Sequence, residues 1–395
     1  MPAVSDRSSC LPSSPIRKLS AYANNAKKKG IKVYHLNIGQ PDIDTLPSLI
    51  QEIKKTDIKI LDYSPSEGIE EFRHKLSEYY SYYNLDIPAS NIITTIGASE
   101  ALFIAFSVCL NEGEEIIIPE PSYANYYSYA FLNKCVVKPI NTFIDNNFAL
   151  PSFSEFEKII TKQTKAILIS NPNNPTGYVY KPEEMEYLKQ LALKYNLFII
   201  SDEAYREFCY DDATSISIMS IDDIDDHAIL IDSMSKRYSA CGARLGMFIT
   251  KNKKVYDNAL KYAQMRLSPP TLEQIAASKA ISKDNFEYLK SVNKLYTSRR
   301  NLIVELLQEI PGVICHKPQG AFYVTVELPI DDSDKFCKWL LEHFSYNKST
   351  VMLAPGSGFY LDPIKGKKQV RIAYVLKEDD IINAITCLKE ALKVY

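Results

Sequence analysis

The chain has 395 residues, of which 46% are hydrophobic and 24% are charged, proportions that are ordinary for a globular protein. Its formal net charge is only −2, so no charge imbalance points to nucleic acid or to an anionic membrane as a partner. The sequence contains no run of about 20 apolar residues, which excludes a conventional membrane-spanning helix. We therefore expect two or three domains with ordinary hydrophobic cores.

Cysteine and histidine usage narrows the chemistry further. The eight cysteines are widely separated and form no C-x-x-C pair, so we expect reduced thiols and a cytoplasmic location. The five histidines show no spacing typical of metal ligands, so we expect no metal site. The first 15 residues are rich in Ser and Pro and lack the layout of a secretion signal, which predicts an N-terminal arm.

The predicted elements begin with a helix over residues 16–29 and an extended segment over 33–38, followed by a turn at 39–42. Between residues 91 and 250, short apolar runs then alternate with helix-like stretches. The runs are NIITTI (91–96), EIIIPE (115–120), AILIS (166–170), LFIISD (197–202), HAILIDS (227–233) and GMFIT (246–250). Continuous apolar strands that alternate with helices are typical of a mostly parallel sheet covered on both faces.

The C-terminal quarter has a different pattern. Apolar residues recur at helical spacing over 288–310, and Pro311-Gly312 ends this predicted helix. Strands are expected at 321–326 and 369–375, and helices at 334–344 and 378–392, which together indicate a smaller α+β domain. We expect residues 1–45 to form the arm and part of this small domain, 46–287 the large domain, and 288–395 the rest of the small domain.

Small and polar residues follow the ends of several predicted strands. These segments are Gly97-Ala98-Ser99, residues 171–177 (NPNNPTG), residues 202–205 (DEAY) and residues 232–236 (DSMSK). Taken singly, each has the composition of a turn or a helix cap. Ligands of open α/β sheets bind at the carboxyl ends of the strands, however, so together the segments predict a binding site at that edge.

The order and spacing of these segments resemble one known family. The element S-x-S-K ends at Lys236, and Arg244 follows eight residues later, downstream of N-x-N-N-P-T-G and D-E-A-Y. From Gly39 to Arg371 the sequence resembles the fold type I pyridoxal-phosphate enzymes, specifically the class I aminotransferases that act on aspartate and aromatic amino acids. The resemblance implies an α/β fold, with a large domain whose mostly parallel sheet of the seven-stranded type lies between helices, and a smaller α+β domain.

The resemblance also implies a site for pyridoxal 5′-phosphate. Lys236 would hold the cofactor as a Schiff base, and Asp202 would pair with the pyridine nitrogen and keep it protonated. The other implied cofactor contacts are Gly97, Ala98, Ser99, Ser233 and Arg244 at the phosphate, Asn174 and Tyr205 at the phenolic oxygen, and Tyr123 on the ring face. Lys236, Asp202 and Tyr205 are thus the expected catalytic residues.

On the substrate side, the resemblance implies that Arg371 binds the α-carboxylate, with Asn174 beside it. The backbone at Gly39 would close over that carboxylate, and Phe322 would form a wall of the pocket. Tyr63 matches a tyrosine that reaches the phosphate of the neighbouring subunit in this family. If it does so here, each site needs two chains and the enzyme is a homodimer with shared active sites.

The implied activity is the transfer of an α-amino group from an amino acid to a 2-oxo acid in a ping-pong cycle. Its alternative on the same scaffold is a β-eliminating carbon–sulfur lyase. A non-catalytic regulator would need a DNA-binding region before the fold, for which the N-terminal arm is too short. A nucleotide-binding protein would need G-x-x-x-x-G-K-[ST] or G-x-G-x-x-G, and neither occurs in the expected place.

The preferred substrate side chain stays open between acidic, aromatic and other neutral types. Some members that select acidic substrates carry a lysine at the position of Ser99, and its absence here argues against that subtype. Arg17, in the segment that borders the pocket in relatives, is a candidate for the missing positive charge, although a solvated helix arginine is an equal alternative.

Overall fold

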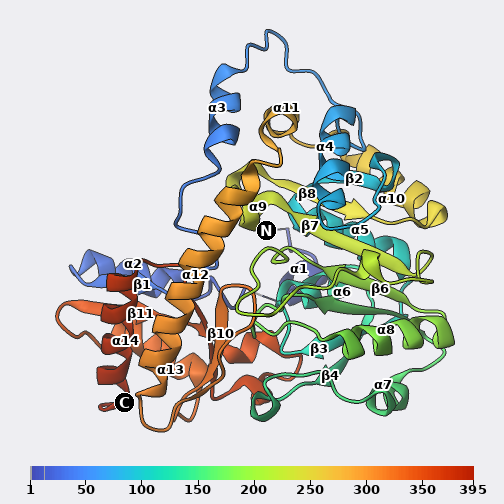
Figure 1. The fold of residues 1–395 in the computed structure, drawn as a ribbon. Coiled ribbons are helices and arrows are strands. Elements are labelled where there is room, and N and C mark those ends of the chain that lie inside the picture. Colours follow the sequence, from blue (N-terminus) through green and yellow to red (C-terminus); the bar gives the residue numbers. More distant parts are fainter. Residues whose placement is uncertain (1, 13) are drawn as a thin grey trace.

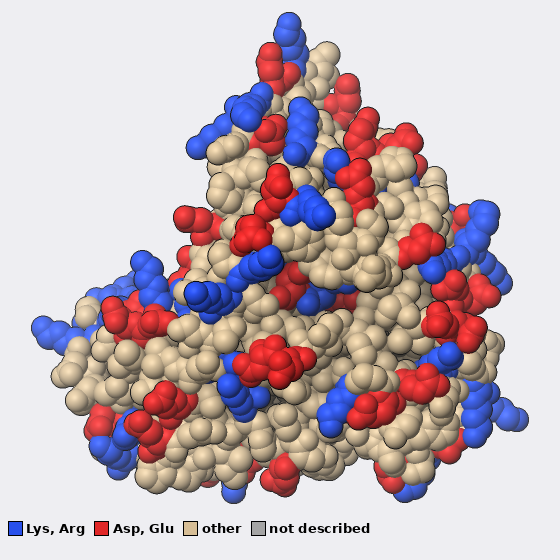
Figure 2. Space-filling model, in the orientation of Figure 1, with Lys and Arg blue, Asp and Glu red and all other residues tan. Residues whose placement is uncertain are grey.

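The computed structural model describes residues 2–12 and 14–395. Figure 1 shows a larger part built around a twisted sheet and a smaller part at the lower left, with the long helix α12 (Asn285–Gln308) running from one to the other. In the part of the chain that the structure describes, no helix has both the length and the apolar character needed to cross a membrane. Acidic and basic side chains are interspersed over the face seen in Figure 2.

The larger part contains a seven-stranded sheet with the order β2-β8-β7-β6-β5-β3-β4. The strands are β2 (Ile92–Ile96), β3 (Glu115–Glu120), β4 (Val136–Asn141), β5 (Thr164–Ser170), β6 (Phe198–Asp202), β7 (Ala228–Ser233) and β8 (Leu245–Ile249). Strand β8 runs antiparallel to both of its neighbours, and all other pairings in the sheet are parallel. The predicted fold class, with a mostly parallel sheet between helices, is confirmed.

Helices cover both faces of this sheet. Successive residues of a strand point to opposite faces, so each strand contributes apolar side chains to both layers. Ile117 and Ile167 belong to one core cluster, whereas the adjacent Ile116 and Ala166 belong to the other. The first cluster contains residues from α4 (Glu70–Ser81), α8 (Pro182–Tyr195) and α11 (Thr271–Ala280), and the second from α5 (Gly97–Cys109), α6 (Asn125–Leu132) and α10 (Lys253–Arg266). The buried strands are therefore apolar on both faces, as their sequences predict.

The smaller part combines the N-terminal and C-terminal regions. Strand β1 (Lys32–His35) pairs with β11 (Ser349–Met352), and a second sheet has the order β12 (Ala354–Pro355), β13 (Gln369–Ala373), β10 (Tyr323–Glu327), β9 (Ile314–Cys315). Helices α2 (Ser20–Lys28), α13 (Ser333–Glu342) and α14 (Glu378–Leu392) contribute to its hydrophobic core together with α12. The domain limits expected from the sequence stay a prediction.

Several elements differ from the sequence-based expectations. Strand β4 has no uniform apolar run and contains Pro139, which an edge strand tolerates because one of its sides forms no ladder. The helix predicted over 16–29 begins only at Ser20, and the arm contains a short exposed helix, α1 (Asp6–Cys10).

The α-helices not yet described are α3 (Pro47–Lys55), α7 (Phe153–Ile159) and α9 (Met234–Arg237).

Candidate functional site

The predicted site residues gather at the carboxyl ends of three neighbouring strands. Asp202 is the last residue of β6, and it lies opposite Ser170 of β5 and Ile231 of β7 in the parallel ladders. Asn174 follows β5, and Lys236 lies in α9, directly after β7. The sheet order therefore brings together side chains that are far apart in the sequence, as expected for an open α/β sheet.

Asp202 is a buried carboxylate whose surroundings control its charge. Its Oδ2 accepts a hydrogen bond from the Tyr126 hydroxyl (2.8 Å), and its Oδ1 accepts one from the Ala204 N–H (3.2 Å). Burial raises the pKa of Asp202 to about 6, although both hydrogen bonds oppose the rise. A cationic partner such as a protonated pyridine nitrogen would stabilise the carboxylate there. Tyr126 was not predicted as a site residue, since a tyrosine within a helical run carries no signal of its own.

Lys236 has an environment with few anionic groups. Its Nζ donates a hydrogen bond to the carbonyl of Gly39 (2.7 Å) and lies 3.9 Å from the Cys241 sulfur. The rings of Tyr205 and Phe322 have their centroids 5.9 and 6.0 Å from the same nitrogen. In the described chain, Lys236 forms no ion pair with a carboxylate. The amine therefore lies beside aromatic rings and the predicted substrate-side loop.

The first turn of α5 and Arg244 lie close together and carry donors suited to a phosphate. Gly97 has φ +69°, and a Cβ there would lie 2.2 Å from Nη2 of Arg244. A Cβ on Gly246 would lie 2.2 Å from the carbonyl carbon of Gly97, so this approach requires glycine. Arg244 donates to the carbonyls of Cys241 (3.0 Å) and Ile96 (3.3 Å).

No carboxylate of the described residues pairs with the Arg244 guanidinium, which leaves its charge available to an anion at the start of a 13-residue helix. Ser99 is exposed in the first turn of that helix, and Ala98 is half-buried. Ser233 is buried, and its Oγ accepts a hydrogen bond from the Ser235 N–H (3.1 Å). The Ser233 hydroxyl itself lies within donating distance of the Ser235 Oγ (2.9 Å) and the Leu245 carbonyl (3.3 Å), so the first turn of α5 and Arg244 are the donors that best fit a phosphate group.

Arg371 is a buried cation without an anionic partner among the described residues. Its side chain is 1% exposed, and it donates from Nη1 to Oδ1 of Asn174 (2.9 Å) and from Nη2 to the carbonyl of Asn37 (2.5 Å). Its Nε has no hydrogen-bond partner in the described chain. The rings of Tyr323 and Phe359 lie 4.3 and 5.1 Å from the guanidinium. A buried cation of this kind is costly unless a ligand supplies the anion, and a carboxylate matches the planar guanidinium.

The aromatic side of the site differs in detail from the expectation. Phe322 is fully buried; it packs against Phe208 and Tyr296 of the core, but its ring also contacts Tyr205 and lies 6.0 Å from the Lys236 Nζ. Tyr323, which was not predicted, faces the site as well: its hydroxyl lies 2.7 Å from that of Tyr205, and a Cβ on Gly39 would meet it at 1.7 Å. Alternate residues of a strand point to the same face, so Tyr323 and Thr325 of β10 share one face of the sheet. Thr325 lies opposite Arg371 in the ladder with β13, and this places Tyr323 on the same face as Arg371.

The other predicted site residues vary in their distance from this centre. Tyr123 is half-buried, packs edge-on against Tyr126 with centroids 5.5 Å apart, and accepts a hydrogen bond from Asn125 (3.0 Å). Tyr63 is 80% exposed on the loop between α3 and α4, which projects at the top of Figure 1, so a single chain does not bring it to the site. Arg17 is also exposed.

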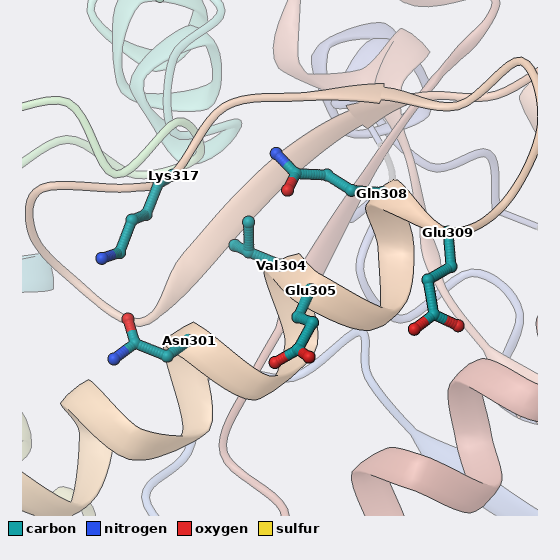
Figure 3. Close-up of a pocket in the computed structure, with 6 residues that line it drawn as sticks. All are labelled: Asn301, Val304, Glu305, Gln308, Glu309 and Lys317. Carbon is teal, nitrogen blue, oxygen red and sulfur yellow. The ribbon is translucent and has the colours of Figure 1, made fainter.

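A separate open groove lies on the outer side of α12 (Figure 3). Its lining consists of four residues from the last turns of that helix, the residue that follows the helix, and one residue from the loop after β9: Asn301, Val304, Glu305, Gln308, Glu309 and Lys317. None of them is a predicted site residue. The groove therefore has no part in the site at the sheet edge.

Comparison with known proteins gives a consistent result. The family described as "Aminotransferase class I and II" matches residues 31–388. An aspartate aminotransferase of Pyrococcus horikoshii is 33% identical over 99% of this chain and 97% of its own length. An aromatic-amino-acid aminotransferase of Thermococcus litoralis is 32% identical over 99% and 98% of the two chains. The solved structure of an alanine aminotransferase from Pyrococcus furiosus superposes with a TM-score of 0.90, at 30% identity and full coverage of both chains.

Proposed function

Because the chain belongs to the class I and II aminotransferases and is therefore a pyridoxal-phosphate-dependent transferase, we propose specific roles for its residues in transamination. Lys236 holds the cofactor, and Arg371 binds the α-carboxylate of the amino acid. The observation that carries this proposal is the buried Arg371 guanidinium, which has no anionic partner among the described residues and has Asn174 as its neighbour.

The cofactor contacts follow from the donors at the sheet edge. The first turn of α5, Ser233 and Arg244 would hold the phosphate, and Asp202 would pair with the pyridine nitrogen and keep it protonated. When bound, the cofactor supplies an electron sink for the charge that develops at the substrate Cα. The buried Asp202 carboxylate gains a cationic partner in return, which lowers the cost of its burial.

Lys236 acts as the base that moves a proton at the substrate Cα. A general base must reach the proton it removes, and Lys236 lies on the same side of the site as Gly39, whose backbone flanks the Asn37 carbonyl bound to Arg371. The Tyr205 hydroxyl would bind the phenolic oxygen of the cofactor. Its contact with the Tyr323 hydroxyl fixes the orientation of the Tyr205 side chain.

We propose that amino acids with neutral side chains, aromatic ones included, are accepted. The residues that cover Arg371 are the aromatic Tyr323 and Phe359, and a serine stands at position 99. The relatives act on aspartate, aromatic amino acids or alanine by their names, so family membership alone does not select one. A panel of single amino acids, each tested for loss of the visible absorption band of the enzyme, decides between these classes.

The reaction type is tested by its dependence on an acceptor. With a 2-oxo acid present, the enzyme should turn over repeatedly, and without it each site should react once. Repeated release of ammonia and a 2-oxo acid without any acceptor would instead identify a β-eliminating lyase.

We also propose a homodimer with shared active sites in the cytoplasm. Large apolar side chains are exposed on the loop that carries Tyr63 and at the end of α10, namely Ile60, Leu61, Tyr63, Met265 and Leu267. An exposed apolar surface of this kind favours burial against a second copy. All the described cysteines are free, which agrees with a reducing compartment.

A further inference from the structure

Glu120 is a fully buried carboxylate that links the larger and smaller parts of the molecule. Its Oε1 accepts a hydrogen bond from the Tyr127 hydroxyl of α6 (2.6 Å). The same oxygen accepts one from the N–H of Leu361 (2.6 Å), in the segment that follows the short helix η5 (Gly356–Phe359). Glu120 and Leu361 are 241 positions apart, so this carboxylate acts as a cross-link between distant segments.

Neighbouring contacts attach the same segment at a second point. The N–H of Ser122 donates to the carbonyl of Phe359 (2.8 Å), and the Tyr127 hydroxyl lies 3.1 Å from that carbonyl. Lys365 lies with its Nζ 3.8 Å from Oε2 of Glu120 and donates to Asn141 of β4 (2.6 Å). The loop after β12 is therefore held against the end of β3 by hydrogen bonds and one ion pair.

The attached segment forms one wall around Arg371. The segment begins with strand β12, which pairs with β13 so that Ala354 lies opposite Arg371. The Phe359 ring is 1% exposed and lies 5.1 Å from the guanidinium. Glu120 binds this segment at Leu361, which is two residues after Phe359.

The charge of Glu120 depends on the same contacts. Burial raises the pKa of Glu120, and the proximity of Asp362 adds to the rise. The hydrogen bonds from Tyr127 and the Leu361 N–H, together with the charge of Lys365, oppose it. Among the described neighbours, Tyr360 is the other titratable group that interacts with this carboxylate. Both hydrogen bonds reach Oε1, whereas the buried Oε2 has no hydrogen-bond partner among the described residues and is compensated only by the charge of Lys365 at 3.8 Å.

We propose that Glu120 is a positioning residue for substrate binding: its carboxylate holds residues 359–361 so that Phe359 stays packed against Arg371. The inference rests on the proposed role of Arg371 as the α-carboxylate site. It predicts that loss of the Glu120 contacts weakens binding of every amino acid, whatever its side chain. The proton transfer at Lys236 is unaffected, because Glu120 does not contact that residue.

The first test compares Glu120→Ala with Glu120→Gln. The alanine variant removes the acceptor for both donors, whereas glutamine keeps the reach and an oxygen that accepts both hydrogen bonds. We expect KM for the amino donor to rise about tenfold in the alanine variant and to stay within about threefold in the glutamine variant. In both, kcat and the visible absorption band of the bound cofactor should be unchanged. The amino-acid concentration that bleaches half of that band without acceptor should shift in parallel with KM.

A second pair of variants keeps Glu120 itself intact. Leu361→Pro deletes the N–H that donates to Glu120, at a position whose side chain is 49% exposed, and the preceding Tyr360 is extended (ψ 147°), as a residue before proline requires. Leu361→Ala retains the N–H and is the matched control. We expect a KM increase of about fivefold for the proline variant and none for the alanine variant.

The KM of an Arg371→Lys variant distinguishes failure of the positioning role of Glu120 from failure of the proposed α-carboxylate site. If Arg371→Lys raises KM but Glu120→Ala and Leu361→Pro do not, the positioning role is wrong and the carboxylate site stands. If Arg371→Lys leaves KM unchanged, both inferences are wrong. A fall in kcat at unchanged KM in the Glu120 variants, or equal KM increases for alanine and glutamine, would also overturn the positioning role.

Discussion

The guanidinium of Arg371 donates a hydrogen bond to Oδ1 of Asn174 across 2.9 Å, and this bond joins β13 of the smaller part to the loop after β5 of the larger part. Both residues are buried, and the Nε of Arg371 has no partner among the described residues. The substrate carboxylate would complete this arrangement. A ligand bound there also connects the two parts of the molecule.

Replacement of Arg371 by Leu should therefore remove α-carboxylate recognition. Loss of a buried charged partner costs about 2–5 kcal/mol in comparable sites, so kcat/KM should fall by a factor of roughly 30 to 4,000 for all amino acids. Steady-state kinetics with several donors gives this ratio. An equal kcat/KM for variant and wild type would show that the carboxylate binds elsewhere.

Gly246→Ala tests the close packing at the predicted phosphate site. The added Cβ would lie 2.2 Å from the carbonyl carbon of Gly97 and 2.5 Å from the Ala98 nitrogen, so the start of α5 must move. We expect the free energy of unfolding to fall by about 1–3 kcal/mol, and cofactor affinity to fall about tenfold. Denaturant unfolding and cofactor titration measure the two effects.

Gly242→Ala is the matched control for this variant, because a Cβ at Gly242 meets nothing within 4 Å. It should behave as wild type in both measurements. If Gly246→Ala and Gly242→Ala bind the cofactor equally well, the start of α5 does not determine phosphate binding.

Glu203 should make the stability of the protein depend on pH. Its side chain is fully buried, its Oε2 has no partner among the described residues, and burial raises its pKa from 4.5 to about 7. A carboxyl whose pKa is raised on folding stabilises the fold below its unfolded pKa, and this contribution is lost as pH rises through the folded pKa. Between pH 4.5 and about 7, Glu203 should therefore lower the free energy of unfolding as pH increases, by about 2 kcal/mol.

Glu203→Gln should flatten that decline, which thermal unfolding at a series of pH values would reveal. Glu305→Gln, at an exposed position of α12, is the control and should retain the wild-type slope. An identical slope in Glu203→Gln would show that Glu203 does not titrate in this range.

Tyr63 tests whether two chains share each site. Tyr63→Ala and Lys236→Ala should each be inactive or strongly impaired, but their mixture, after dissociation and reassociation, should recover about a quarter of the wild-type sites. Half of the randomly formed dimers contain both chains, and one site of each such dimer has both native residues. Activity that does not rise on mixing would place Tyr63 outside the neighbouring site.

The sequence predicted the sheet because its strands are buried on both faces and are therefore apolar throughout, as in β5 and β7. It could not predict β4, where Pro139 and Lys138 at an edge strand break that pattern. The polar segments that follow strand ends predicted a binding site at the carboxyl edge of the sheet, whereas the roles of Asp202 and Lys236 came from the resemblance to the aminotransferase family.

Residues that act through tertiary contacts carried no comparable signal. Tyr126 meets Asp202 from the middle of a helix, and Tyr323 meets Tyr205 from a strand of the smaller part. Glu120 becomes a link only when Leu361 folds against it. In each case the partner lies at a distance along the chain that no local pattern encodes.

The central claim is that Lys236 holds the cofactor, and peptide mass spectrometry tests it most directly. Treatment of the purified enzyme with sodium borohydride should fix the cofactor to the amine that binds it, and the digested protein then shows which lysine carries the added mass. We predict a single modified peptide, with the modification on Lys236. A modification on any other lysine, with Lys236 unmodified, would contradict the assignment of the site.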